Sequence, residues 1–225
     1  MARSRLRALG WWVADYNFAV YWQIRGLFNR TDPATLHAGD KAPVVVIPGI
    51  YESWRFLLPL IAQIHALGHP IHVVPTLKWN LRPVAEAAAL VNDHLEVHDL
   101  KGVIIVAHSK GGLLGKQVMV EPHGSRRVHG MLAVATPFGG SVYARFMLAP
   151  SLRIFSPKNS TIRALGLEEA VNSRIVSVYG KFDPHIPARS ELAGAKNVEL
   201  NTGGHFRILA NPRVLAEFTL MAPAR

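Results

Sequence analysis

The stretch Val103-Ile-Ile-Val-Ala-His-Ser109-Lys-Gly-Gly-Leu-Leu-Gly115 decides the fold of this chain. Its first half is a run of β-branched and small apolar residues, which is typical of a strand buried on both faces of a parallel sheet. From Lys110 onward the pattern is helical, so Ser109 lies at a strand-to-helix corner. Small residues flank the serine at Ala107 and Gly111, because larger side chains would collide at such a corner. A nucleophilic serine is therefore predicted, above a helix N-terminus that favours developing negative charge.

Short apolar runs alternate with longer amphipathic stretches on both sides of this motif. The strands we expect are Val44–Ile47, Ile71–Val74, Val103–Ala107, Gly130–Ala135, Arg174–Tyr179 and Asn197–Leu200. The helices we expect are Ser53–Leu67, Arg82–His98, Lys110–Glu121, Ser160–Val171 and Pro212–Met221. This alternation predicts an α/β fold, a three-layer α/β/α sandwich around a mainly parallel sheet of about six strands.

Composition narrows the class of protein. The chain has 225 residues, of which 49% are hydrophobic and 18% charged, enough for one sizeable core and too apolar for a disordered chain. Cysteine is absent, which excludes disulfides, thiolate metal sites and a cysteine nucleophile. The balance of 25 Lys+Arg against 15 Asp+Glu gives a formal net charge of +10, which favours contact with anionic surfaces.

Four features in chain order carry a resemblance to a known family. They are Ile47-Pro-Gly-Ile50, Ala107-His-Ser-Lys-Gly111, Ala135-Thr-Pro-Phe-Gly-Gly-Ser141, and the loops of Asp183 and His205. In these the chain resembles the α/β-hydrolase superfamily, and within it the small bacterial lipases and esterases that tolerate alanine at the first position of the serine motif. The third feature is similar to a turn common in triacylglycerol lipases. The resemblance covers roughly Pro43 to Met221 and implies a minimal α/β-hydrolase fold without cofactor.

The acid partner of the serine follows by elimination. A serine hydroxyl needs a histidine to take its proton and an acid to orient that histidine, in the chain order Ser, acid, His. No carboxylate lies between Glu121 and Glu168, so an acid directly after the fourth strand is excluded. Asp183 is the only aspartate beyond Asp99, and it lies in the loop that leaves the fifth strand. Asp183 is therefore the predicted acid.

The base is predicted from its loop. Four histidines follow the serine, at His123, His129, His185 and His205. His205 lies between the last strand and the last helix, and its preceding glycine pair lets the loop curl toward Ser109. His185 is the rival, but it lies two residues from the acid and would leave the last loop without a role. We interpret it as a loop residue beside the acid.

An oxyanion and a pocket complete the predicted site. One oxyanion donor is the backbone N–H of Lys110, which follows the nucleophile, and by resemblance the other is the N–H of Ile50. Tyr51, Phe138 and Phe206 flank these loops and are candidate substrate-binding residues, although each is equally consistent with core packing.

The first 30 residues are predicted to form a basic, aromatic helical segment, followed by the hydrolase domain over residues 31–225. Polar residues interrupt both a signal-peptide core and a membrane span, so we expect a cytoplasmic or peripheral membrane protein without a cleavable signal. An apolar stripe has helical spacing: Leu9, Trp12, Val13, Tyr16, Val20, Ile24 and Leu27. Either this stripe lies on an anionic membrane, with Arg3, Arg5 and Arg7 near the lipid, or it packs on the domain or on a second subunit.

Residues 136–167 are too long for a simple connection, and we expect them to form a lid-like excursion. They include Arg145, Arg153, Lys158 and Arg163 but no carboxylate.

Two other signals do not lead to a predicted site. The histidine pairs 65/69 and 94/98 have metal-ligand spacing but no third ligand, and we interpret them as solvated helix faces. The basic residues are scattered and match no nucleic-acid motif, so no nucleic-acid partner is expected.

These observations predict a serine hydrolase of small-molecule or lipid carboxylic esters, lipase- or esterase-like and selective for an apolar acyl group. Two alternatives stay open. The same three residues serve acyltransferases, thioesterases and amidases. A catalytically silent, membrane-associated binding protein on this fold is the other alternative. The oligomeric state is left undetermined.

Overall fold

The computed structural model describes residues 2–223. Met1, the first residue of the predicted N-terminal segment, and residues 224–225, the last of the predicted hydrolase domain, lie outside the described residues. The side chains of Arg3, Arg5 and Arg145 also lie outside them. Six parallel strands form one sheet in the order β2-β1-β3-β4-β5-β6. The strands are β1 (Val44–Ile47), β2 (Ile71–Val73), β3 (Val103–His108), β4 (Val128–Val134), β5 (Ile175–Phe182) and β6 (Lys196–Gly203). All six predicted strands are confirmed; β1 has the predicted bounds, and the ends of the other five shift by at most three residues.

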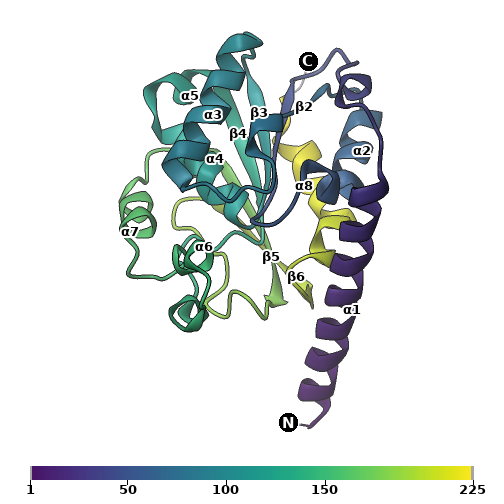
Figure 1. The fold of residues 1–225 in the computed structure, drawn as a ribbon, viewed down its shortest axis with the longest axis vertical. Coiled ribbons are helices and arrows are strands. Elements are labelled where there is room, and N and C mark those ends of the chain that lie inside the picture. The colour runs from purple at the N-terminus through teal and green to yellow at the C-terminus, as the bar shows by residue number, and fades with distance from the viewer. Residues whose placement is uncertain (1, 224–225) are drawn as a thin grey trace.

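Helices cover both faces of the sheet (Figure 1). The α-helices are α1 (Ala2–Phe28), α2 (Leu58–Ala66), α3 (Val84–Val97), α4 (Lys110–Val120), α5 (Pro122–Arg127), α6 (Pro150–Arg153), α7 (Ser160–Leu167) and α8 (Pro212–Met221). Short 3-10 turns are η1 (Pro33–Leu36), η2 (Trp54–Leu57), η3 (Pro75–Leu77), η4 (Val142–Phe146), η5 (Asn172–Arg174) and η6 (Arg207–Ala210). The predicted three-layer α/β/α sandwich is confirmed.

The alternation of side chains along the central strand explains why its sequence is apolar throughout. Ile105 and Ala107 of β3 join the core beneath α3 and α4, whereas Ile104 and Val106 join the core beneath α2 and α8. All four are fully buried. A strand covered on both faces has no solvent side on which a polar residue would be favoured.

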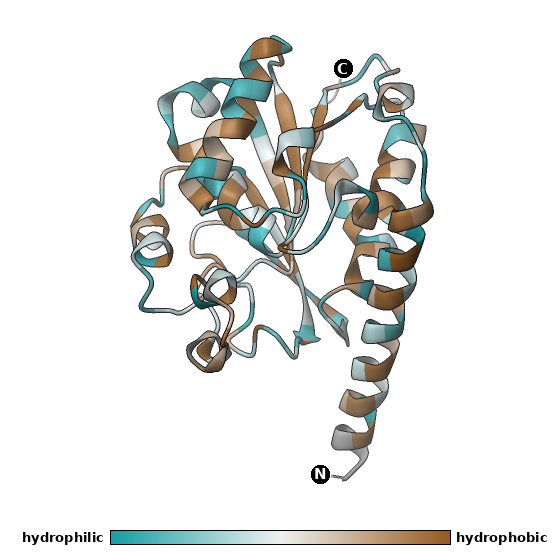
Figure 2. Cartoon of the chain, viewed as in Figure 1, coloured by the Kyte–Doolittle hydropathy of each residue, from teal (hydrophilic) through white to brown (hydrophobic). Residues whose placement is uncertain are grey.

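The N-terminal helix α1 packs along the edge of this domain, and its first turns project past β6 (Figure 1). Its inner face lies against β6, η2 and η6, where Trp11 stacks on Phe182 and Phe18 meets Phe56 edge to face. The interpretation in which the apolar stripe packs on the domain was therefore wrong about the face. The stripe is exposed, and hydrophobic residues recur along α1 (Figure 2). Its exposed side chains include Leu9, Trp12, Val13, Tyr16, Val20, Ile24 and Leu27.

The structure corrects the interpretation of the histidine pairs as solvated helix faces for His69 and His94, whereas His98, at the end of α3, is exposed as expected. His69 lies past the end of α2, is buried, and its Nδ1 is 2.9 Å from the Ala42 carbonyl oxygen. His94 contacts His98 and His72, and burial, helped by repulsion from His98, lowers the pKa of His94 to about 4. Within residues 2–223, no cluster of three or more histidines and carboxylates could hold a metal ion.

None of the helices in the described part of the chain has the length and apolar character needed to cross a membrane. Residues 136–167 form η4, α6 and α7 with intervening loops, and they lie beyond the carboxyl ends of the strands (Figure 1).

Candidate active site

Ser109 occupies the corner between β3 and α4 with a positive φ of 51°. A non-glycine residue held there costs about 1–3 kcal/mol, which the surrounding packing must outweigh. The corner brings α4 so close to β1 that a Cβ on Gly111 would lie 2.2 Å from the Ile47 carbonyl oxygen. A Cβ on Gly112 would lie 2.0 Å from the Thr136 hydroxyl oxygen. These contacts are the physical reason for small residues after the serine.

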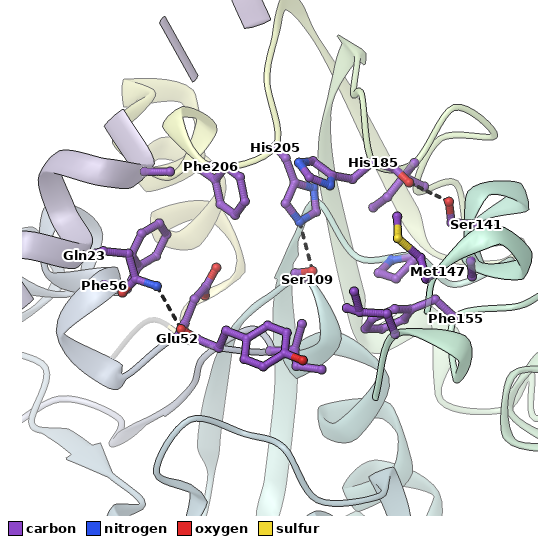
Figure 3. Close-up of a pocket in the computed structure, with 17 residues that line it drawn as sticks. Gln23, Glu52, Phe56, Ser109, Ser141, Met147, Phe155, His185, His205 and Phe206 are labelled. Carbon is purple, nitrogen blue, oxygen red and sulfur yellow. Dashed lines mark hydrogen bonds between the residues drawn. The ribbon is translucent and has the colours of Figure 1, made fainter. Parts of the chain in front are cut away.

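The structure brings Ser109, His205 and Asp183 together from three separate loops at the carboxyl edge of the sheet. Ser109 Oγ lies 2.9 Å from His205 Nε2 (Figure 3), and His205 Nδ1 lies 2.8 Å from Asp183 Oδ2. All three residues are at most 8% exposed. An ionised carboxylate only accepts hydrogen bonds, so Nδ1 carries the proton and Nε2 is free to accept the serine O–H.

Electrostatics favour an ionised Asp183 and a strongly basic His205. Burial, the largest influence, raises the pKa of Asp183, but His205 and the backbone N–H of His185 outweigh it and hold that pKa below its ordinary value. Burial lowers the pKa of His205, but the carboxylates around it, Asp183 first, outweigh burial and hold the pKa above its ordinary value. The second oxygen of Asp183 accepts the N–H groups of His185 and Ile186 at 2.8 and 3.0 Å.

The predicted oxyanion donors lie beside the serine. Among the described residues, the backbone N–H groups of Ile50 and Lys110 have no hydrogen-bond acceptor. The loop of Ile50 is held by the N–H of Tyr51, which donates to the Trp79 carbonyl at 2.8 Å. The ammonium of Lys110 points away and donates to the Asn80 carbonyl at 2.7 Å; burial lowers its pKa to about 8.

A cavity of about 320 Å³ opens next to Ser109 and His205. Apolar side chains make up most of its lining, and it lies between α1 and the 136–167 excursion (Figure 3). Of the predicted substrate-binding residues, Tyr51 and Phe206 line it. Phe138 does not; its ring packs in the core with Ile162 and Leu165, because in this turn the neighbouring Pro137 takes the position facing the cavity.

A buried pair beside the triad was missed by the sequence analysis. His108 Nδ1 lies 2.9 Å from Glu52 Oε2, and His108 Nε2 lies 3.0 Å from the His205 carbonyl oxygen. A carbonyl only accepts, so Nε2 is the donor and His108 holds the backbone of His205. Glu52 also accepts the N–H of Gly49 at 2.7 Å. The available signal was His108 itself, a polar side chain that ends an otherwise apolar buried strand.

His185, the rejected base, also lines the cavity. Its carbonyl oxygen accepts a hydrogen bond from the Ser141 hydroxyl at 2.6 Å (Figure 3). Burial, followed by repulsion from His205, lowers the pKa of His185 to about 4. Among the described residues, the His185 side chain is hydrogen-bonded to neither Ser109 nor Asp183. Its Nε2 lies near the Tyr16 hydroxyl, and Asp183 accepts the His185 backbone N–H instead.

Solved structures resemble this chain. The lipase B of Aspergillus fumigatus matches with a TM-score of 0.63 at 17% identity, over 78% of this chain and 51% of the fungal one. The mature Bacillus licheniformis lipase BlEst2 matches with a TM-score of 0.59 at 17% identity, over 83% and 97% of the two chains. The enol-lactonase of Burkholderia xenovorans LB400 matches with a TM-score of 0.54 at 12% identity, over 81% and 91%.

This chain spans about half the length of the Aspergillus fumigatus lipase B, at 51%. No protein-family model matches the chain, and no curated protein matches it by sequence. The sheet order, the corner at Ser109 and these structural matches together show that the chain has the α/β-hydrolase superfamily fold, in a minimal form.

Replacing Gly111 by alanine tests the corner. The added methyl group would meet the Ile47 backbone, which cannot move without shifting β1, so we expect Gly111→Ala to lower the free energy of unfolding by about 1–3 kcal/mol or more. Urea denaturation measures this. Gly166→Ala in α7, where a Cβ meets nothing within 4 Å, is the control, and it should be neutral or stabilising. Equal stability of the two variants would contradict the close approach.

Proposed function

We propose that this protein is a serine hydrolase that cleaves carboxylic esters through an acyl-serine intermediate. The observation that carries the proposal is the hydrogen-bonded relay from Ser109 through His205 to Asp183 at the mouth of an apolar cavity. Such a relay activates a hydroxyl as a nucleophile. A histidine or serine with a purely structural role does not require it.

In the proposed reaction, Ser109 Oγ attacks the ester carbonyl carbon while its proton passes to His205 Nε2. The Nδ1 proton of His205 stays hydrogen-bonded to Asp183, which stabilises the imidazolium. The N–H groups of Ile50 and Lys110 donate to the oxyanion, and this intermediate collapses when the alcohol leaves with the proton from Nε2. Water, deprotonated by the same nitrogen, then attacks the acyl-serine and releases the acid, and Ser109 regains its proton.

The acyl group we propose is apolar. Aromatic and aliphatic side chains surround the cavity next to Ser109, among them Phe56, Met147, Phe155, Ile186 and Phe206. A charged or strongly polar acyl group would lose its hydration there without gaining enough hydrogen bonds in return.

Labelling with a fluorophosphonate probe tests the mechanism. We expect the native chain to be labelled, and Ser109→Ala and His205→Ala to lose labelling by at least about 1,000-fold, because the nucleophile or its base is gone. Lys158→Ala, on an exposed loop residue, is the control and should label at the native rate. A folded native chain that fails to label, with and without detergent, would favour the catalytically silent binding protein.

A series of p-nitrophenyl esters tests the acyl preference. We expect kcat/KM to rise from acetate to octanoate, because each buried methylene contributes up to about 0.8 kcal/mol. Phe155→Ser, which makes the cavity wall polar, should flatten this rise, whereas the acetate rate should change little. A preference of the native chain for acetate would exclude the lipid-like substrate. Added alcohols or amines that appear in the products would indicate acyl transfer.

We also propose that α1 and the tip of the 136–167 excursion rest on an anionic lipid surface. The apolar stripe of α1 is exposed, with Val20 at 56% and Ile24 at 51%. Across the mouth of the cavity, Leu148 at the tip of the excursion is 89% exposed. Such an apolar surface around a pocket is typical of contact with a membrane or a partner.

Charge favours the anionic membrane over a second copy of the chain. The guanidinium of Arg7 lies over the ring of Trp11, and that of Arg25 lies over Trp22, and both arginines are exposed on α1. The single carboxylate of α1, Asp15, is fully buried and faces the domain. An exposed helix with cations and aromatic rings but no exposed acid suits anionic headgroups.

Vesicle sedimentation tests this surface. The full chain should bind vesicles of phosphatidylcholine with phosphatidylglycerol, and added salt should weaken binding. The double variant Val20→Asp/Ile24→Asp should bind on the order of tenfold more weakly, because charge then enters the apolar layer. Val97→Asp, on an apolar residue of α3 that is 79% exposed, is the control. Unchanged vesicle binding would contradict the proposal, and a dimer that the double variant dissociates would assign the stripe to self-association.

A further inference from the structure

The N-terminal helix reaches the backbone of the proposed base. Asp15, in the middle of α1, is fully buried although it is a carboxylate. Its Oδ2 accepts the backbone N–H of His205 at 2.8 Å, 190 residues away in sequence. Its Oδ1 accepts the N–H groups of Phe206 and Arg207, each at 2.8 Å. Burying a carboxylate is costly unless it is hydrogen-bonded, and these three donors supply that compensation.

The glycine pair before His205 makes room for α1. A Cβ on Gly203 would lie 2.5 Å from the ring of Trp11, and a Cβ on Gly204 would lie 2.4 Å from Asp15 Oδ1. Gly204 also has a φ of +120°, which disfavours other residues. The two glycines therefore shape the histidine loop to fit α1 as well as to curl toward the serine.

Two further side chains of α1 contact the other loops of the site. The Tyr16 hydroxyl lies 3.1 Å from Nε2 of His185, in the loop of the proposed acid. The amide of Gln23 donates to the Tyr51 carbonyl at 2.8 Å, in the loop of the proposed oxyanion donor (Figure 3). One helix thus contacts all three loops that meet Ser109.

The peptide groups on both sides of His205 are held. Asp15 accepts its N–H, and His108, backed by Glu52, donates to its carbonyl. The imidazole is left to turn only about its side-chain bonds, where Ser109 and Asp183 hold it. A backbone held in this way keeps Nε2 within reach of the serine, and displacement by about 1 Å can lower a rate 100-fold.

We infer that Asp15 is a positioning residue for the proposed base, and that α1 is a structural part of the active site rather than an appended anchor. This inference rests on the proposed function and adds to it a residue outside the minimal α/β-hydrolase domain. Asp15 also acts through charge: after Asp183 and Glu52, it is among the carboxylates that raise the pKa of His205.

The test compares Asp15→Asn with the native full-length chain. Asparagine keeps the size of the side chain but removes the charge and leaves one acceptor oxygen for three N–H groups. We expect kcat for a p-nitrophenyl ester to fall about 10- to 100-fold, with KM changed by less than about threefold. The acid limb of the pH–rate profile should move to lower pH, because His205 loses a nearby negative charge and its pKa falls.

Trp22→Leu is the matched control, because it removes a ring from the inner side of α1 without touching the three loops. If Trp22→Leu loses as much stability in urea as Asp15→Asn does, it should still retain the native kcat and pH profile. Should Asp15→Asn fail to fold, Gly203→Ala, which pushes Trp11 away from the histidine loop, should lower kcat in the same way.

The His205 imidazole, titrated by NMR, separates this inference from the proposed function. If the native chain hydrolyses no ester, a lower His205 pKa in Asp15→Asn still supports the inference, and an unchanged pKa overturns it. If the native chain is active, an unchanged kcat and pH profile in folded Asp15→Asn overturns it, as does a loss of kcat equal to that of Trp22→Leu.

Discussion

The close approach of α4 to β1 at the Ser109 corner is the constraint on which the rest of the structure depends. Only a residue without a side chain at position 111 lets the helix start directly against the Ile47 carbonyl. The same contact places the start of α4 against the end of β1, where the loop of Ile50 begins. The strained φ of Ser109 is tolerated because β1 and β3 are fully buried and hold the corner in place.

Around that corner the site is built from buried charge that is hydrogen-bonded. Asp183, Glu52 and Asp15 are all at most 8% exposed, and each is satisfied by backbone N–H groups or by a histidine. In a protein interior such hydrogen bonds are strong, and a missing partner is costly, so the network has a single favourable arrangement. This rigidity is what a relay of short hydrogen bonds requires, since small displacements of the base lower rates steeply.

The two faces of α1 have different proposed roles. Its inner face delivers Asp15 and Gln23 to the loops of the site, and its outer face presents the apolar stripe, of which Tyr16, at the border between the faces, also contacts His185. Since the same helix lines the cavity through Ala19 and Gln23, a lipid surface in contact with the stripe would lie at the cavity mouth. Recognition of the surface and alignment of the base would then depend on one rigid element.

The sequence alone was enough for the sheet, because its central strands contain uninterrupted apolar runs such as Val44–Ile47 and Val103–Ala107, a pattern set by burial on both faces. It also predicted Ser109, Asp183 and His205 as candidates, since local turn chemistry and chain order leave few others, and the structure brings these three side chains together. The direction of Phe138 into the core depends on packing across the turn after β4, which no local pattern encodes. The buried face of α1 was likewise decided only in the tertiary structure. Its apolar stripe is the more obvious core face by periodicity, but the helix buries the face of Asp15 instead, because three backbone N–H groups 190 to 192 residues away need an acceptor.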